Sequence, residues 1–249
     1  MLTASKRILD CESVPSIYES LHKSFGIDEG SLNEWFDELG AELAHLDEAS
    51  DEFLLRPIKN LVVPDKPFDT TFWFHLTRTL RSTTFTEGIL PLPKVLDSLW
   101  EALFELAQHI VSREDWDQFR LSLSGIYEYN SKLEDAIHWG PYGFLILPLA
   151  MADYTSSQTF SHYLTSPEII EDICGHFRED FNFDLLAAFQ ECTVARIIKF
   201  EDHKSKLEHL CAAIRYLYFV YHGKYPDVLN PIFSGEVGYS QIQKEVLFD

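Results

Sequence analysis

Positive charge is scarce in this chain, in which 20 lysine and arginine residues face 40 aspartate and glutamate residues, for a formal net charge of −20. Affinity for nucleic acids comes largely from basic side chains that neutralise phosphates. An acidic surface repels those phosphates, so we do not expect a nucleic-acid interface. The same field would attract a basic protein partner, although a solvated acidic surface without a partner is the commoner case.

Cysteine is also rare, and its spacing excludes several chemistries. The chain has four cysteines, none of which forms a Cys-x-x-Cys pair: Cys11, Cys174, Cys192 and Cys211. Three of them lie in segments that we expect to face the core, which favours free thiols and a reducing, cytoplasmic compartment. The ten histidines show no zinc-binding spacing, so we expect no metal.

Long apolar runs and nucleotide-loop motifs are absent from the sequence. Residues 144–151 form an apolar run that is far too short to span a bilayer, and the N-terminus lacks an apolar stretch after its basic pair, so we expect no membrane partner. Neither G-x-G-x-x-G nor G-x-x-x-x-G-K-[ST] occurs, and no G-x-S-x-G elbow is present. Rossmann, P-loop and serine-hydrolase interpretations therefore have no support.

Hydrophobic residues make up 46% of the chain, enough for a globular core. Residues 1–66 alternate short helical segments with polar breaks. Ser13 is expected to cap a helix with Pro15 in its first turn, and Ser31 with Glu34 forms a capping box for a second helix. We therefore divide the chain into an acidic helical N-terminal extension, 1–66, and an α+β core domain, 67–249, packed as one unit.

The core domain shows strand and helix patterns in irregular alternation. Strands are predicted at 70–77, within 138–151, at 192–200 and at 242–248. Amphipathic helices are predicted from Pro93 onward, in part of 112–133, after Ser166-Pro167 and from about Leu207 to an end near Gly223. This order predicts an α+β fold with a split mixed or antiparallel sheet and flanking helices.

The segment 70–86 contains no acidic residue, although the chain is otherwise rich in them. It carries His75, Arg78 and Arg81, which makes a local anion site plausible. If Phe74 faces the core, His75 points to the other face of the strand, and Thr77 and Arg78 converge on a ligand from the strand end. The alternative is an exposed strand end whose arginines pair with acidic helices.

Two short motifs resemble the ADP-ribosyltransferase fold family. The stretch FHLTRTLRSTTFTEGILPL carries an H-x-T element at His75 and Thr77, followed by G-[IFL]-x-P at Gly88 and Pro91. Near the end of the chain, QKEVL resembles the Q-x-E element of another branch of the family, whose glutamate falls on Glu245. That branch usually opens with arginine in place of the histidine.

The resemblance implies that NAD is the substrate. His75 and Thr77 would bind its nicotinamide-ribose half, a tyrosine, here Tyr142, would stack on the nicotinamide, and Glu245 would polarise the reacting ribose. His75 and Glu245 are then the catalytic candidates.

Charge-assisted pairing with an anion assigns the pyrophosphate of NAD to Arg78 or Arg81. Glu191 and Glu236 remain rival carboxylates to Glu245.

Two functions follow from these patterns. The first is an NAD-binding ADP-ribosyltransferase-like protein with a bacterial-type conflict or regulatory role. The second is a non-enzymatic acidic interaction protein, resembling an immunity protein or antitoxin that neutralises a basic effector; an inactive transferase fold lies between them. The expected partner is accordingly a small nucleotide or a basic protein.

Overall fold

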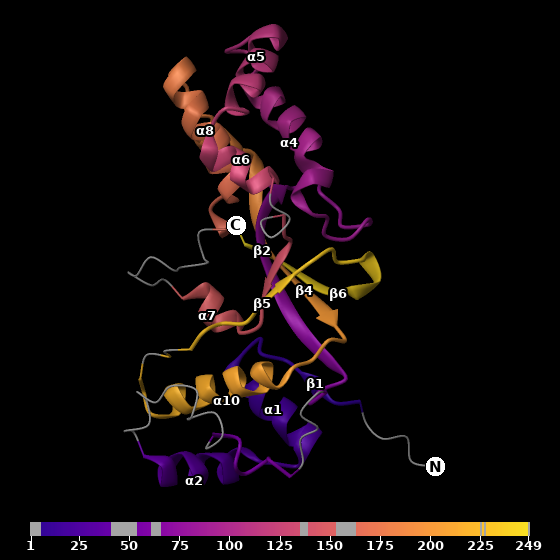
Figure 1. Cartoon of the computed structure of the whole chain (residues 1–249), viewed down its shortest axis with the longest axis vertical. Coiled ribbons are helices and arrows are strands. Elements are labelled where there is room, and N and C mark those ends of the chain that lie inside the picture. The colour runs from indigo at the N-terminus through magenta and orange to yellow at the C-terminus, as the bar shows by residue number, and fades with distance from the viewer. Residues whose placement is uncertain are drawn as a thin grey trace. The chain divides into compact units, whose positions relative to one another are not determined.

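The computed structural model describes residues 6–40, 54–60, 66–134, 139–152, 163–224, 226 and 228–248. Their helices and strands follow one another irregularly along the chain and build a single mixed sheet with flanking helices (Figure 1). The predicted α+β fold is confirmed. The first residue of the stretch 138–151, His138, lies outside the described residues.

The strands are β1 (Ile8–Leu9), β2 (Thr70–Leu80), β3 (Tyr142–Phe144), β4 (Thr193–Asp202), β5 (Ile232–Ser234) and β6 (Ile242–Phe248). Their order is β5-β3-β2-β4-β6, and β1 pairs in parallel with the start of β2. β2 and β3 are antiparallel and meet at Phe74 and Phe144. The three longer strands confirm the predictions at 70–77, 192–200 and 242–248.

The helices of the N-terminal and central regions are α1 (Val14–Phe25), α2 (Glu29–Leu39), α4 (Leu92–Ala107), α5 (Arg113–Leu123), α6 (Tyr127–Glu134) and α7 (Leu147–Met151). Those that follow are α8 (Glu168–Phe181), α9 (Leu185–Cys192), α10 (Leu207–Tyr221) and the short 3-10 helix η4 (Tyr239–Gln241).

The chain divides into two compact units, each built from several stretches of sequence. The first unit contains Met1–Phe74, Phe144–Ala152 and Lys199–Phe233, and the second contains His75–Gly143, Asp153–Ile198 and Ser234–Asp249. β2 and β4 each contribute residues to both units. The division into 1–66 and 67–249 inferred from the sequence stays a prediction.

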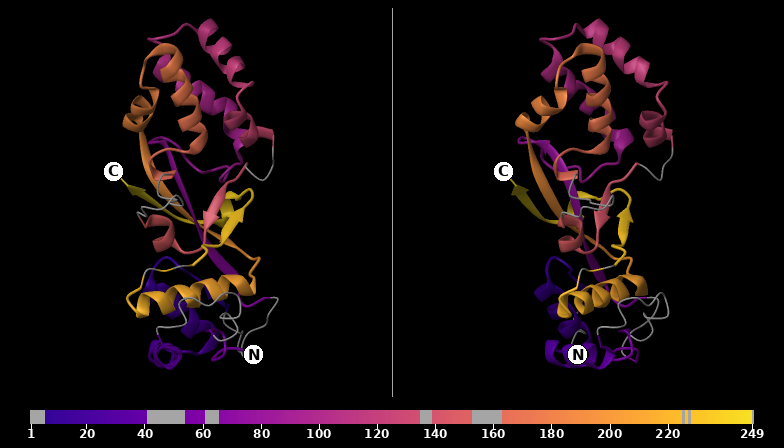
Figure 2. Two further views of the ribbon diagram at one scale, coloured as in Figure 1. Left: turned by 60° about the vertical axis from the view of Figure 1, so that its left-hand side comes forward. Right: turned by 90° about the vertical axis from the view of Figure 1, so that its left-hand side faces the viewer.

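In the first unit, α10 packs on α1 and α2, and both views of Figure 2 show these helices alongside one another. Ser13 caps α1 as predicted, since its Oγ accepts a hydrogen bond of 3.3 Å from Ser16 N. The capping box predicted at Ser31 is wrong. Asp28 caps α2 instead and accepts from Ser31 N at 2.8 Å, because its carboxylate, three residues earlier, competes successfully for the free amides.

His209 is buried in the first unit, near the start of α10. Its ring meets Trp73 edge-on with centroids 5.0 Å apart, and its Nδ1 accepts from Lys206 N at 3.3 Å. Burial lowers the pKa of His209 to about 4, and Lys206 adds to that effect whereas Glu208 and Asp202 oppose it. The imidazole is therefore neutral in the folded protein at pH 7.

Acid should destabilise the protein through this residue. Because the pKa of His209 is about 4 when folded and about 6.5 when unfolded, the unfolded chain binds more protons between those values, so stability is lost as the pH falls. We expect His209 to cost about 2 kcal/mol of unfolding free energy between pH 7 and pH 5. Urea unfolding at both pH values should show a smaller loss in His209→Phe.

The exposed His203 provides the control for this effect. Its side chain is 61% exposed, so His203→Gln should lose as much stability between pH 7 and pH 5 as the unmodified protein. If His209→Phe and the unmodified protein lost the same unfolding free energy between pH 7 and pH 5, His209 would not be the cause of the acid destabilisation.

The helices of the second unit surround an aromatic core. Its central side chains are Trp100, Trp116, Phe119, Tyr129 and Phe177. Trp100 meets Trp116 edge-on at 5.1 Å, and its Nε1 donates to Tyr129 Oη at 3.0 Å. This packing groups α4, α5, α6 and α8 together (Figure 1). The helix from Pro93, the helix after Ser112 and its interruption near Gly125 are confirmed.

One further local prediction is wrong, and one helix was not predicted. The apolar run 144–151 predicts the continuation of a buried strand, but β3 ends at Phe144 and α7 follows. Pro148 lies in the first turn of α7, where a missing N–H costs nothing. Helix α9 is a further difference, because the sequence patterns did not predict it. Asp184 caps this helix by accepting from Ala187 N at 3.1 Å.

Candidate functional site

His75 lies on β2 and is hydrogen-bonded to β3. Its Nδ1 is 2.8 Å from the backbone carbonyl oxygen of Tyr142. A carbonyl can only accept, so Nδ1 carries the hydrogen and Nε2 carries a lone pair in the neutral ring. Burial lowers the pKa of His75, although the bond to Tyr142 opposes the shift. His75 is therefore neutral at pH 7 and presents Nε2 as an acceptor.

Among the described residues, His75 Nε2 has no hydrogen-bond partner. A neutral imidazole nitrogen fixed in this way suits a ligand that donates a hydrogen bond, such as a hydroxyl group. It does not suit a phosphate oxygen, which can only accept unless it is protonated.

Arg78 holds the start of β4 with its whole guanidinium group. Its Nε donates to Thr193 Oγ1 at 2.8 Å, and its Nη2 donates to the carbonyls of Gln190 at 2.7 Å and Thr193 at 3.2 Å. Its Nη1 donates to the carbonyl of Leu164 at 3.1 Å. All three nitrogens are thus engaged with protein groups, and binding an anion would require some of these bonds to be exchanged.

The alternation of side chains along β2 and β4 sorts the candidates between the two faces of the sheet. Because Arg78 and Thr193 bond through their side chains, they share one face. Arg196 is three residues beyond Thr193 on β4, so it lies on the opposite face. His75 and Thr77 alternate with Arg78 on β2 and lie on that opposite face too.

Arg196 brings Glu245 of β6 to the same face as His75. Its Nη1 forms an ion pair with Glu245 Oε1 and donates to the carbonyl of Thr83 at 3.2 Å. Its Nη2 donates to the carbonyls of Leu80 at 2.8 Å and Arg81 at 2.9 Å. The side chain of Arg196 is 4% exposed, whereas that of Glu245 is 34% exposed. The pair therefore has a buried cation and a carboxylate at the surface.

Tyr142 contributes its backbone to the His75 bond, and its hydroxyl acts electrostatically on Tyr163. Tyr163 Oη is 3.0 Å from Glu168 Oε1. Burial is the main cause of the raised pKa of Tyr163, and the charges of Glu168 and Tyr142 add to the shift. The hydroxyl of Tyr142 thus acts on the residue that precedes Leu164, the carbonyl partner of Arg78.

The segment that contains Gly88 is fastened to the segment before β6. Ile89 N donates to Val237 O at 2.8 Å, and Val237 N donates to Ile89 O at 3.2 Å. Gly88 has φ +89°, and a Cβ built on it would lie 2.0 Å from Val237 O. The backbone approach requires a residue without a side chain at this position.

The structure arranges the predicted residues in two groups within the second unit. His75 is bonded to Tyr142, and Glu245 is joined through Arg196 to the carbonyl of Arg81. His75 and Tyr142 thus form one group, and Glu245, Arg196 and the turn that carries Arg81 form the other. The face that His75 and Glu245 share contains Thr77 but not Arg78. The side chain of Tyr142 lies on the Arg78 face, because Tyr142 is two residues from Phe144, which pairs with Phe74.

The rival carboxylates have other surroundings. Glu236 pairs with Lys94 at 2.6 Å on the surface, and Glu191 is exposed at the end of α9. Arg196 was not among the residues predicted from the sequence. The sequence did contain a signal for Arg196, because it is an arginine inside the apolar strand TVARIIKF. A buried arginine needs a carboxylate or carbonyl partner.

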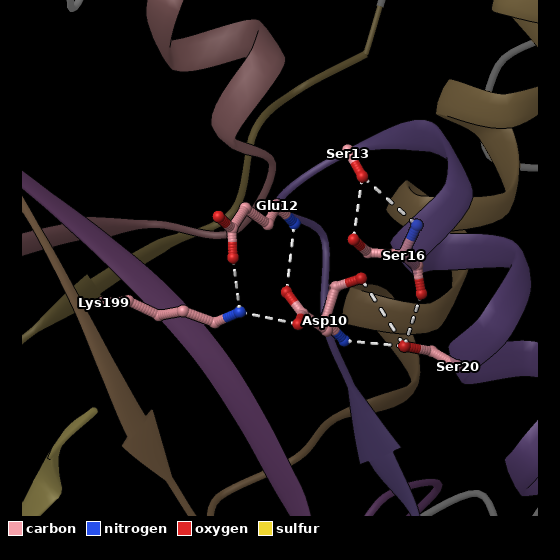
Figure 3. Close-up of polar contacts among 6 residues, drawn as sticks. All are labelled: Asp10, Glu12, Ser13, Ser16, Ser20 and Lys199. Atoms are coloured by element: carbon pink, nitrogen blue, oxygen red, sulfur yellow. Dashed lines mark hydrogen bonds and ion pairs between the residues drawn. The ribbon is translucent and has the colours of Figure 1, made fainter. Parts of the chain in front are cut away.

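A second polar cluster lies in the first unit, where residues 10–12 meet β4 (Figure 3). Lys199 Nζ is 2.6 Å from Asp10 Oδ2 and 2.8 Å from Glu12 Oε2, and it lies 4.6 Å from the ring centroid of Phe72. Its side chain is only 12% exposed. Because two carboxylates of residues 10–12 bind the single ammonium group of Lys199, this cluster fastens the chain segment before α1 to β4.

The described parts of the chain contain no group of three or more His, Cys, Asp and Glu side chains placed to hold a metal ion. No helix in those parts has both the length and the apolar character needed to cross a membrane. All four cysteines are free thiols, three of them buried.

Comparison of the sequence and structure with protein-family models, curated proteins and solved structures gave no significant match.

Proposed function

We propose that this chain binds NAD as an ADP-ribosyltransferase-like protein, through the sheet face that contains His75 and Glu245. The observation that carries the proposal is the bond between His75 Nδ1 and the carbonyl of Tyr142, at 2.8 Å. It fixes a neutral imidazole whose Nε2 accepts a hydrogen bond. A ribose hydroxyl is a donor of the matching kind.

Glu245 supplies the second requirement of this chemistry. Cleavage of the bond between nicotinamide and ribose develops positive charge on the ribose ring, which a nearby carboxylate stabilises. Glu245 reaches the surface, and its Oε1 is held by Arg196. Among the described residues, its Oε2 has no bonding partner, so this oxygen is the one available to the ribose.

The protein's own residues contribute orientation more than covalent chemistry. His75 is fixed by its bond to a strand backbone, and Arg196 is fixed by three backbone carbonyls, so both groups are set before a ligand arrives. Such preorganisation lowers the barrier because little entropy is lost on reaching the transition state. Arg78 and Arg81 both remain candidates for the pyrophosphate, and Arg78 would have to exchange some of its bonds to Thr193, Gln190 and Leu164 to bind it.

The test compares the unmodified protein with a substitution of His75 that separates the roles of its two nitrogens. In His75→Asn the amide nitrogen takes the place of Nδ1 and can keep the bond to Tyr142, but the acceptor at Nε2 is lost. We expect titration calorimetry to show micromolar NAD binding by the unmodified protein and at least a tenfold loss in His75→Asn, about 1.4 kcal/mol. Nicotinamide release should fall with it.

His176→Ala is the control, because His176 contacts Glu179 on the surface of α8 and its substitution should leave NAD binding unchanged. Equal NAD binding by His75→Asn and the unmodified protein would contradict the assignment of His75. Folded, unmodified protein that neither binds NAD nor releases nicotinamide would overturn the proposal and favour the acidic interaction protein.

A further inference from the structure

Arg196 has more partners than a simple ion pair requires. Its guanidinium bonds Glu245 on β6, the carbonyl of Leu80 at the end of β2, and the carbonyls of Arg81 and Thr83 just beyond it. The ring centroid of Phe85 lies 5.8 Å from Cζ. One buried side chain of β4 therefore fixes Glu245 relative to the turn that carries Arg81.

This arrangement is poorly optimised for stability alone. Arg196 Nε is buried and has no hydrogen-bond partner in the described part of the chain. An unsatisfied buried donor of a charged group destabilises a protein, and apolar residues often replace a buried ion pair without loss. Features that cost stability in this way are concentrated at functional sites.

We propose that Arg196 is the positioning residue for Glu245. It holds Oε1 and so restricts the carboxylate to orientations that leave Oε2 toward a ligand on the sheet face. The inference rests on the proposed function, in which Glu245 acts on the ribose of NAD. Arg196 itself contacts no ligand, because Nη1 and Nη2 donate to the carboxylate and to backbone carbonyls and Nε is buried.

Arg196→Lys keeps the positive charge and can reach Glu245, but a lysine cannot bond three carbonyls and a carboxylate in the fixed planar geometry of a guanidinium. If Arg196 positions Glu245, kcat for nicotinamide release should fall about tenfold, while KM for NAD stays within about threefold. When the Glu245 carboxylate is no longer held in one orientation, it stabilises the transition state less, whereas the binding of NAD in the ground state changes little.

A double-mutant cycle separates positioning from structural damage. Glu245→Gln alone should lower kcat, and Arg196→Lys added to it should lower kcat little further, because the residue that it positions is already altered. Damage to the fold would instead lower kcat by the same factor in both backgrounds. Thermal unfolding of each variant should confirm that it is folded.

Arg113→Lys is the matched control for Arg196→Lys. Arg113 forms a two-pronged ion pair with Glu101 at 2.9 and 2.8 Å on exposed helices of the same unit, and its substitution should leave kcat unchanged. The inference would be overturned, while the proposed function stands, if Arg196→Lys left kcat unchanged. It would also be overturned if Arg196→Lys lowered kcat by the same factor with Glu245 and with Glu245→Gln. Absence of NAD binding and turnover in the unmodified protein would overturn both.

Discussion

Replacing Gly88 by alanine should strongly destabilise the protein, although the change adds a single methyl group. The added Cβ would lie 2.0 Å from the carbonyl oxygen of Val237, and the backbone at Gly88 has φ +89°. Strain at positive φ costs about 1–2 kcal/mol. Separation of the backbones would also break both hydrogen bonds between Ile89 and Val237, at about 1 kcal/mol each.

We therefore expect Gly88→Ala to lower the unfolding free energy by about 4 kcal/mol, measured by urea denaturation followed by circular dichroism. Against a typical total of about 5–15 kcal/mol, this loss would remove between about a quarter and four fifths of the stability. This result would explain the glycine of the G-[IFL]-x-P motif by the close packing of two backbones, whether or not the protein binds NAD.

Gly175→Ala is the matched control and should have the opposite sign. Gly175 lies inside α8, and a Cβ there would meet nothing within 4 Å. Alanine is favoured over glycine in a helix interior by roughly 0.5–1 kcal/mol. A Gly88→Ala protein as stable as the unmodified one would show that the backbones at residues 88 and 237 do not approach each other so closely.

The second large effect is expected at Lys199, whose ammonium group lies between Asp10 and Glu12 (Figure 3). Lys199→Met keeps most of the aliphatic stem but removes the charge. The two carboxylates then face each other at a site where the lysine was 12% exposed. Breaking a fully buried pair by removing one partner costs about 3–5 kcal/mol. Because Asp10 and Glu12 are 24% and 32% exposed, we expect a loss of about 2–3 kcal/mol in urea denaturation.

Lys94→Met tests whether burial is the reason for the large stability loss expected in Lys199→Met. Lys94 Nζ lies 2.6 Å from Glu236, as close as Lys199 to Asp10, but the two side chains are 53% and 49% exposed. Surface pairs contribute less than about 1 kcal/mol. Similar losses in Lys94→Met and Lys199→Met would show that the carboxylate cluster does not fasten residues 10–12.

Local patterns were sufficient for most of the secondary structure. The strand that begins at Thr70 followed from β-branched and aromatic content, and the helix that begins at Leu207 followed from the helical spacing of apolar residues. The strand runs three residues beyond the predicted end at Thr77. The errors arose where two local signals competed, as at Asp28 and Ser31, or where an apolar run suited either structure, as at 144–151. Burial does not distinguish a short strand from a short helix.

The sequence by itself determined the fold class and the candidate positions on β2 and β6, because the spacing of apolar residues and the turn residues specify structure between near neighbours in the chain. Only the tertiary structure decided which side chains meet. Arg78 and Thr193 are 115 residues apart, and Arg196 and Glu245 are 49 apart. With 40 acidic residues in the chain, charge alone does not select the partner of Arg196; strand order and the alternation of faces do.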